Sequence, residues 1–374
     1  MIMSKSKLAI AVGALMLVSS PLTANDLPEL DFFGRVSLNL YHLDAEDQHS
    51  TSVVDDKSLN SRLGASFQQN LGNGLVGFGK TEWNFQPSDA ESFAQQRDTF
   101  VGIRGGWGQV ALGTFHGAYK ITGGVLWDPM ITTPIESRRQ AGMAGGAYGH
   151  NAFMRRMVEY RTPSLNGFRG ILQYGFDRRD TSTPGSYGDV NLSVQYVTGD
   201  WDFIGAYVNA DSEESGENTN WKIGAKWSPG SWTLAAQYEE VEIRKGGHRI
   251  DFANVLKGSD GSRPTTALNF ITAGQEAAGD AGLNTDTSHL FLRASRRYGV
   301  HEFHGILGHM DASDLGKRDI TAYTLGYTRW FSPTFRFLGG IQFQDRGSDW
   351  DSGDLTIVTA GLRYDFAASI GGGR

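Results

Sequence analysis

The chain contains no cysteine and only 10 prolines among its 374 residues. The absence of cysteine excludes a disulfide framework and a thiolate metal site, and we expect no cofactor. No segment after residue 24 approaches the ~20 apolar residues that a membrane-spanning helix needs. Basic residues are in deficit, with 34 Lys and Arg against 41 Asp and Glu, and the net charge of -7 argues against nucleic acid as a partner.

Glycine, in contrast, is abundant. The chain has 49 glycines, about twice the usual share of ~7%. They are scattered through aromatic-rich segments, which disfavours a disordered or collagen-like chain. No shift in composition marks a linker between domains, so we expect one all-β domain.

The first residues have the organisation of a secretory signal. Lys5 and Lys7 precede an apolar run at 8–18, and small residues lead to a cleavage position after Ala24. A buried helix is the alternative, but the basic start and the abrupt polar switch favour export. The expected boundaries are 1–24 for the signal peptide, 25–366 for the folded domain and 367–374 for a short C-terminal tail.

From Asp31 onward, polar and apolar side chains alternate with a period of two, which is typical of strands with one wet and one apolar face. In the segment 35–41, Val36, Leu38 and Leu40 share the apolar face. The polar face holds Arg35, Ser37, Asn39 and Tyr41. The same alternation recurs at 189–196, 221–227 and 335–344.

Short and long connections between these runs alternate. Seven tight turns, such as Gly72-Asn73-Gly74 and Ser228-Pro229-Gly230, separate eight long loops. These connections join sixteen strands, and membrane strands of about 9 to 11 residues fit the length of the chain. The sequence therefore predicts a 16-stranded antiparallel transmembrane β-barrel with short periplasmic turns and long extracellular loops.

Aromatic residues gather near the predicted strand ends, where an outer-membrane barrel needs interfacial girdles. This placement favours a membrane barrel over a soluble sandwich or propeller. The final predicted strand runs from Thr356 to Phe366. The residues expected in the girdles are Trp201, Trp221, Trp227, Trp232, Tyr298 and Trp330.

Several motifs resemble the general trimeric porins of Gram-negative outer membranes. They are Ser61-Arg62-Leu63-Gly64, the turn at 70–75, the stretch at 97–108 followed by Leu112-Gly113, and the closing segment 361–366. The resemblance implies a homotrimer and a third loop, about 116 to 153, that folds into the barrel and narrows it. Porins of this family end at the terminal Phe, whereas eight residues follow Phe366 here.

The resemblance also implies a constriction with a basic wall. Arg62 and Arg97 match the motif positions that supply wall arginines, and Arg35 matches the basic position on the first strand. Arg155 is assigned by its parity, with the adjacent Arg156 as the alternative. An arginine against lipid at the membrane midplane costs roughly 2 to 4 kcal/mol, so these polar faces must line the lumen.

The third loop is expected to supply the opposing acids. Asp128 is placed by its proximity to Trp127 and Pro129, and Glu136 by the approximate match of Pro134-Ile135-Glu136 to a Pro-Glu-Phe-Gly pattern of the family. Opposed charges across a narrow aqueous passage create a transverse field that sorts ions. In the alternative interpretation, each arginine pairs with a lumen carboxylate such as Glu82 or Glu159 and only pads the wall.

These features predict a porin in the outer membrane that passes small hydrophilic solutes and ions by passive diffusion, without enzymatic activity. A solute-specific channel, for example for an oligosaccharide or an anion, remains an alternative, although most aromatic residues have outward parity and Tyr41 is an exception. An outer-membrane enzyme or adhesion barrel is a further alternative. The sequence has no Gly-x-Ser-x-Gly nucleophile elbow.

Four long loops, 43–58, 86–96, 209–219 and 345–354, together carry a net charge of -13. We expect an acidic outer mouth at which divalent cations bridge the protein to outer-membrane lipid and lipopolysaccharide. Because rim charges are screened by salt while the basic constriction is narrow, we also expect a weak anion preference at high salt that drifts towards cations as salt is lowered.

Overall fold

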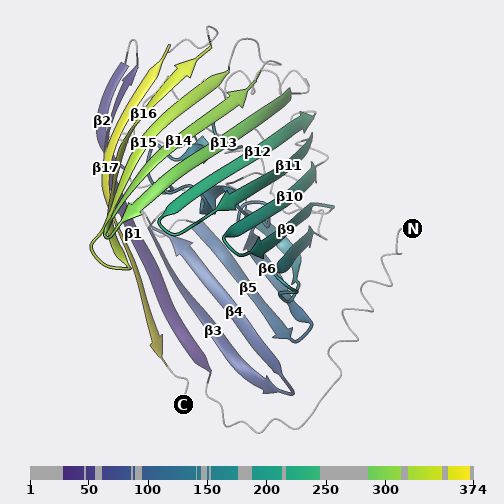
Figure 1. Ribbon diagram of the computed structural model, residues 1–374. Coiled ribbons are helices and arrows are strands. Elements are labelled where there is room, and N and C mark those ends of the chain that lie inside the picture. The colour runs from purple at the N-terminus through teal and green to yellow at the C-terminus, as the bar shows by residue number, and fades with distance from the viewer. Residues whose placement is uncertain are drawn as a thin grey trace.

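In the computed structural model of the chain, the strands form one antiparallel sheet that closes on itself (Figure 1). Residues 28–370 are described, except for 46–47, 55–60, 86, 89–94, 140, 145–149, 151–152, 176–187, 213–215, 245–284, 313–318 and 348–352. The expected signal peptide lies outside the described residues. The strands are β1 (Glu29–Ala45), β2 (Gln48–Val54), β3 (Arg62–Gly72), β4 (Leu75–Asn84), β5 (Gln95–Gly105), β6 (Gly108–His116), β7 (Phe153–Arg161), β8 (Phe168–Gly175), β9 (Val190–Thr198), β10 (Trp201–Ser212), β11 (Gly216–Trp227), β12 (Trp232–Arg244), β13 (Thr285–Tyr298), β14 (His301–Asp311), β15 (Ile320–Trp330), β16 (Phe335–Arg346) and β17 (Leu355–Ile370).

The first and last strands close the barrel. β1 pairs with β17 along one edge, in a register that runs from Leu30 opposite Ile370 to Ala45 opposite Leu355. On its other edge, β1 pairs first with β3 and then with β2. β2 and β3 are therefore two parts of one wall strand, and the predicted sixteen-stranded antiparallel barrel is confirmed.

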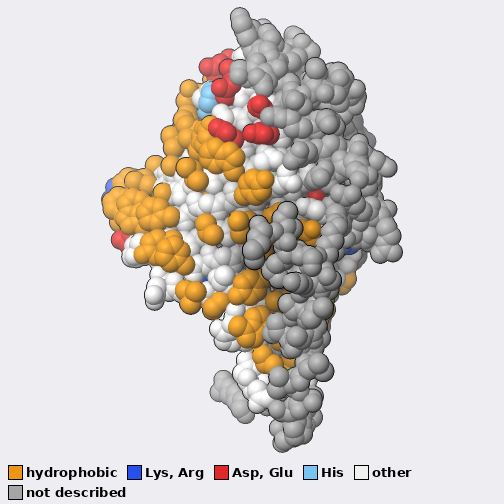
Figure 2. Space-filling view, turned by 90° about the vertical axis from the view of Figure 1, so that its right-hand side faces the viewer, with side chains coloured by type: hydrophobic (Ala, Val, Ile, Leu, Met, Phe, Trp, Pro, Cys, Tyr) orange, Lys and Arg blue, Asp and Glu red, His pale blue; other side chains and the backbone are white. Residues whose placement is uncertain are grey.

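Each strand presents one face to the outside and one to the lumen. Along β15, Tyr323 and Leu325 are 51% and 69% exposed, whereas Thr324 between them is buried. Figure 2 shows hydrophobic side chains spread over the outer wall and acidic side chains gathered at its upper end. Because lipid tails bury apolar surface as well as a protein core does, an exposed apolar wall around a polar interior is the stable arrangement in a membrane.

Short turns close one end of the barrel at all seven predicted positions (Figure 1). The longer connections join the strands at their other ends, except that the predicted loop at 43–58 is mostly strand, with Ala45 of β1 opposite Gln48 of β2. In the β3–β4 turn, Asn73 and Gly74 have φ of 52° and 74°, the left-handed geometry that tight hairpins favour. We call these two ends the short-turn end and the long-loop end.

The last strand is longer than the sequence suggested. β17 continues past Phe366 to Ile370, because β1 begins at Glu29 and its first residues supply backbone partners for 367–370. The helical segments among the described residues are two 3-10 turns, η1 (Gly124–Leu126) and η2 (Ser137–Arg139). Within the same residues, no helix is long and apolar enough to cross a membrane.

Candidate pore constriction

The third loop, which follows β6, lies inside the barrel. Its side chains Tyr119, Met130 and Ile135 are fully buried, and Met130 and Ile135 form an apolar cluster with the inward-facing Tyr41 and Phe291. Tyr41 was noted above as an aromatic residue with lumen parity. Its place beneath the loop shows that it supports the loop and does not form part of a stacking track for sugars.

Side chains of the barrel wall form hydrogen bonds with backbone groups of the third loop from both sides of the lumen. Gln173 of β8 and Asn191 of β9 accept hydrogen bonds from the N–H groups of Ala118 and Tyr119, at 2.9 and 2.7 Å. From the opposite side, Asn39 of β1 donates to the carbonyl of Thr132 at 2.8 Å. Further contacts are Gly124 N–H to Gln237 (2.7 Å), Arg293 to the Trp127 carbonyl (2.6 Å) and Gln342 to the Ile135 carbonyl (3.3 Å).

The two predicted loop acids hold the loop's own conformation. Asp128 accepts hydrogen bonds from the N–H groups of Met130 at 2.9 Å and Ser137 at 2.6 Å. Glu136 accepts one from Thr132 N–H at 3.0 Å and one from the Arg138 guanidinium at 2.5 Å. Asp128 borders the cavity described below, whereas Glu136 is fully buried within the loop. Both acids therefore stabilise turns of the loop, and of the two only Asp128 faces the lumen.

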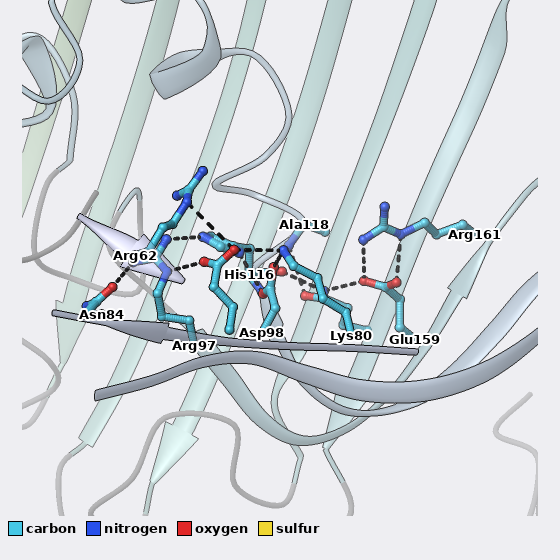
Figure 3. Close-up of polar contacts among 11 residues, drawn as sticks. Arg62, Lys80, Asn84, Arg97, Asp98, His116, Ala118, Glu159 and Arg161 are labelled. Carbon is cyan, nitrogen blue, oxygen red and sulfur yellow. Dashed lines mark hydrogen bonds and ion pairs between the residues drawn. The ribbon is translucent and has the colours of Figure 1, made fainter. Parts of the chain in front are cut away.

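On the wall facing the start of the loop, β3, β4 and β5 bring together a network of charges (Figure 3). Arg97 is fully buried. Its guanidinium donates hydrogen bonds to Glu82 and, at 3.0 Å, to Asn84, and it contacts the His116 ring at 3.1 Å. Arg62 approaches the other Glu82 oxygen at 3.7 Å and keeps 20% of its side chain exposed. Arg97 therefore supports Glu82 from behind, while Arg62 meets the lumen.

Lys80 links this network to a second carboxylate. Its ammonium group lies 3.1 Å from Glu82 and 2.9 Å from Asp98, and Asp98 accepts a hydrogen bond from the His116 backbone N–H at 2.7 Å. Sequence reasoning did not select Lys80. It has the lumen parity of Glu82, but the register that places it beside Asp98 is a property of the folded sheet.

A second basic group lies where the barrel closes. Arg35 of β1 and Arg363 of β17 contact Asp365 at 2.5 and 3.0 Å, and Arg336 of β16 reaches it at 3.4 Å. One carboxylate is shared by three guanidiniums, which leaves net positive charge. Of these three arginines, the sequence predicted only Arg35 as a constriction residue. Arg336 and Arg363 alternate with apolar neighbours, which indicates that they face the lumen but not how deep in the barrel they lie.

Between the loop and these walls lies a cavity of about 560 Å³. Its charged lining has seven bases and four acids, an excess that would favour anions in a narrow aqueous space. The bases are Arg35, Arg62, Lys80, Lys120, Arg293, Arg336 and Arg363; the acids are Glu82, Asp98, Asp128 and Glu302.

Lys120 is the basic residue that the loop itself contributes to the cavity. Its side chain is almost fully buried, and its ammonium group stands 4.5 Å from the centroid of the Phe153 ring. Among the described residues, that ammonium has no hydrogen-bond partner. Burial, reinforced by Arg97 and Arg138, holds the pKa of Lys120 well below the ordinary lysine value.

Arg155 has a different environment from the other predicted arginines. It lies at a bulge of β7, where the pairing with β6 shifts, and both Arg155 and Arg156 are exposed. Arg156 has φ of 56°, and Met154 and Met157 on either side of the pair are both buried. The bulge interrupts the period of two, so the alternation along β7 does not predict which way Arg155 faces. Arg155 is not among the residues that line the cavity.

Two of the expected girdle residues lie elsewhere. Trp221 stands in the interior of β11, six positions from its end at Trp227. Trp330 lines the cavity: its ring lies 4.4 Å from the Arg336 guanidinium carbon, and its indole N–H donates to Glu302 at 3.5 Å. It follows Arg329, which faces outward, so the alternation of β15 turns Trp330 to the lumen. Trp201, Trp227, Trp232 and Tyr298 lie at strand ends and are exposed, as expected.

A closed antiparallel barrel with an apolar exterior, narrowed from within by its third loop, defines a transmembrane channel. The chain belongs to the Gram-negative porin family, whose profile matches residues 11–349. The predicted family, outer-membrane location and role as a channel for passive diffusion of small hydrophilic solutes are confirmed.

Among curated proteins, the chain is 24% identical to outer membrane porin F of Escherichia coli over 64% of this chain and 70% of that protein. It is 22% identical to major outer membrane protein P.IB of Neisseria meningitidis, over 97% of this chain and 100% of that protein.

Solved structures agree on the fold. The anion-selective porin from Comamonas acidovorans superposes with a TM-score of 0.72 at 19% identity, covering 91% of this chain and 100% of that one. The trimer form of OmpT from Vibrio cholerae gives a TM-score of 0.59 at 14% identity, again over 91% and 100% of the two chains.

Proposed function

We propose that the cavity between the third loop and the basic walls is the selectivity constriction of this porin, and that it favours small anions weakly. The observation that carries the proposal is the excess of seven bases over four acids around a single narrow space. In this assignment Arg35 and Arg62 act on the passing ion directly. Arg97 acts by holding Glu82, and Asp128 and Glu136 act by fixing the loop.

The arrangement supports a sieve more than a solute-specific site. Most bases in the lining are already matched to carboxylates, such as Lys80 to Asp98 and Arg35 to Asp365, which leaves a diffuse positive field and not one strong binding point. One structural relative is named as an anion-selective porin, in agreement with this sign of selectivity.

Reconstitution in planar bilayers tests the proposal. We expect stepwise conductance, a zero-current potential of anion-selective sign in a gradient of concentrated KCl, and a current that does not saturate with any one sugar. Saturation by a single sugar or anion would favour the solute-specific alternative, and a cation-selective potential at high salt would contradict the assignment of the constriction.

We further propose that the chain works as a homotrimer, without catalytic activity, after removal of residues 1–24. A trimer is supported by the family and by the trimer form of one structural relative. Light scattering of the protein in detergent gives the subunit number, and N-terminal sequencing of the protein from outer membranes gives the cleavage position.

A further inference from the structure

The outer surface of β12–β16 carries charges that are sorted by end. At the long-loop end, the outward-facing charged side chains that the structure describes on these strands are acids: Glu240, Glu242, Asp286, Asp311 and Asp345. At the short-turn end they are two arginines, Arg296 of β13 and Arg329 of β15. Ser295 and Thr328, which precede the two arginines in sequence, are buried on the lumen side. Because side chains alternate along a strand, both arginines face outward.

The guanidinium of Arg296 lies over two aromatic rings. Its guanidinium carbon lies 4.9 Å from the ring centroid of Trp232, its register partner on β12, and 4.4 Å from that of Tyr298. Its Nε is buried and has no hydrogen-bond partner among the described residues, none of whose carboxylates forms an ion pair with it. The rings lie over the faces of the guanidinium, so its terminal N–H groups, which point along its edge, are the donors that a group outside the protein can reach.

Arg329 lies two strands away in the same belt. It is stacked 5.2 Å from the centroid of Phe331, and its register partner is His301 of β14. His301 contacts the hydroxyl of Tyr327 at 2.7 Å, also on the outer face. Two arginines and a histidine thus stand among aromatic rings at the height of the girdle.

The depth of these arginines suits a boundary between hydrocarbon and headgroups. Arg296 is two residues from the end of β13, or about 7 Å along the strand. The cost of an arginine facing lipid falls nearly to zero at such an interface, where the side chain reaches the headgroup layer. Short turns mark the periplasmic end of outer-membrane barrels, so this interface belongs to the inner leaflet.

We propose that Arg296 and Arg329 bind the headgroup phosphate of a phospholipid in the inner leaflet. A guanidinium presents paired N–H donors that match phosphate oxygens, and a stacked guanidinium is already oriented for them. The sorting of charge along β12–β16 gives the complementarity: a phosphate is attracted to the short-turn end and repelled by the acids of the long-loop end.

The test is retention of phosphatidylglycerol by the full-length mature protein in detergent, measured by native mass spectrometry. We expect Arg296→Gln and Arg329→Gln each to reduce retention about fivefold, and the double variant about 25-fold. Arg297→Gln is the matched control, because it removes the same charge one residue away from a side chain that bonds the Gly299 carbonyl. Arg296→Lys, which keeps the charge but loses the planar fork, should fall between wild type and Arg296→Gln.

Several results would overturn the proposal. One is equal retention of phosphatidylglycerol by the double variant and the wild type. Another is a loss of retention in Arg297→Gln as large as that in Arg296→Gln. A third is retention of lipid A in preference to phosphatidylglycerol at these arginines. A measurement on the wild type needs no variant: diacylglycerol, which lacks the phosphate, should be retained about 25-fold less than phosphatidylglycerol, and equal retention would also refute the site. Conductance in planar bilayers should be unchanged in Arg296→Gln, Arg329→Gln and the double variant, which separates this lipid site from the channel function.

Discussion

The hydroxyl of Tyr119 donates a hydrogen bond of 2.9 Å to Glu239, a residue 120 positions later in the chain, and so ties the third loop to the wall of the barrel. The same carboxylate contacts His150 at 2.6 Å and accepts from the Ala144 N–H at 3.3 Å. Both ends of the inward loop are therefore fastened to one buried glutamate of β12.

Removing one fastening should loosen the loop without unfolding the barrel. We expect Tyr119→Phe to lower the free energy of unfolding by about 2 kcal/mol, the usual contribution of a hydrogen bond to a charged acceptor, and to increase open-channel current noise. Tyr160→Phe is the control, because its hydroxyl donates to the Trp107 carbonyl at 2.9 Å, near the short turns. Equal noise in the two variants would argue against the fastening.

The fastening at His150 should be sensitive to acid. Burial lowers the pKa of His150 from 6.5 to about 4, against the attraction of Glu239. Between about pH 6.5 and pH 4 the unfolded chain therefore binds a proton here that the folded protein does not, so falling pH favours unfolding by about 3 kcal/mol at most. The apparent melting temperature in lipid should drop over this window, and drop less in His150→Gln. Parallel pH profiles would contradict the prediction.

Lys120 should give the anion preference its own pH dependence. Because its pKa is held well below the ordinary lysine value, its positive charge is lost as pH rises, before exposed lysines titrate. We expect the anion-to-cation permeability ratio to decline as pH is raised, at a lower pH than exposed lysines would require, and to decline less in Lys120→Met. A profile unaltered by that substitution would show that Lys120 does not act on ions.

Arg62 and Arg97 should differ in what they control. Arg62 borders the cavity, so Arg62→Ala should move the zero-current potential in a KCl gradient towards cation selectivity and enlarge conductance modestly. Arg97 is buried against Glu82, so Arg97→Ala should lower stability by about 3 to 5 kcal/mol. Arg155→Ala, at an exposed position outside the cavity lining, is the control and should leave the potential unchanged. An unaltered potential in a correctly folded Arg62→Ala protein would identify Arg62 as wall padding.

The acidic outer mouth gives a prediction about divalent cations. Most of the acids in the four loops lie outside the described residues, while Asp44, Glu240 and Asp311 are outward-facing acids of the described strands. Chelation of calcium and magnesium should lower the melting temperature of the protein in membranes containing lipopolysaccharide, and not in phosphatidylcholine alone. A melting temperature indifferent to chelation in both membranes would contradict the bridging.

The sequence alone determined the barrel. Alternation with a period of two, short turns at regular positions and the absence of any long apolar run leave few stable structures for a chain in lipid, where every backbone group must be paired within a closed sheet. Parity also placed Arg35, Arg62 and Tyr41 on the lumen side, because a two-residue period fixes the face of a side chain wherever the strand is regular.

Only the tertiary structure decided which lumen residues meet. Arg336 and Arg363 carry the same parity signal as Arg35, yet it is the register of β1, β16 and β17 that gathers all three around Asp365. A bulge in β7 broke the parity on which the position of Arg155 depended. Which face of a strand a side chain lies on is a local property of the chain. How deep in the barrel it lies, and which side chains it contacts, depend on how strands far apart in sequence are aligned. For that reason the sequence predicted the wall of the barrel, whereas the tertiary structure determined the constriction.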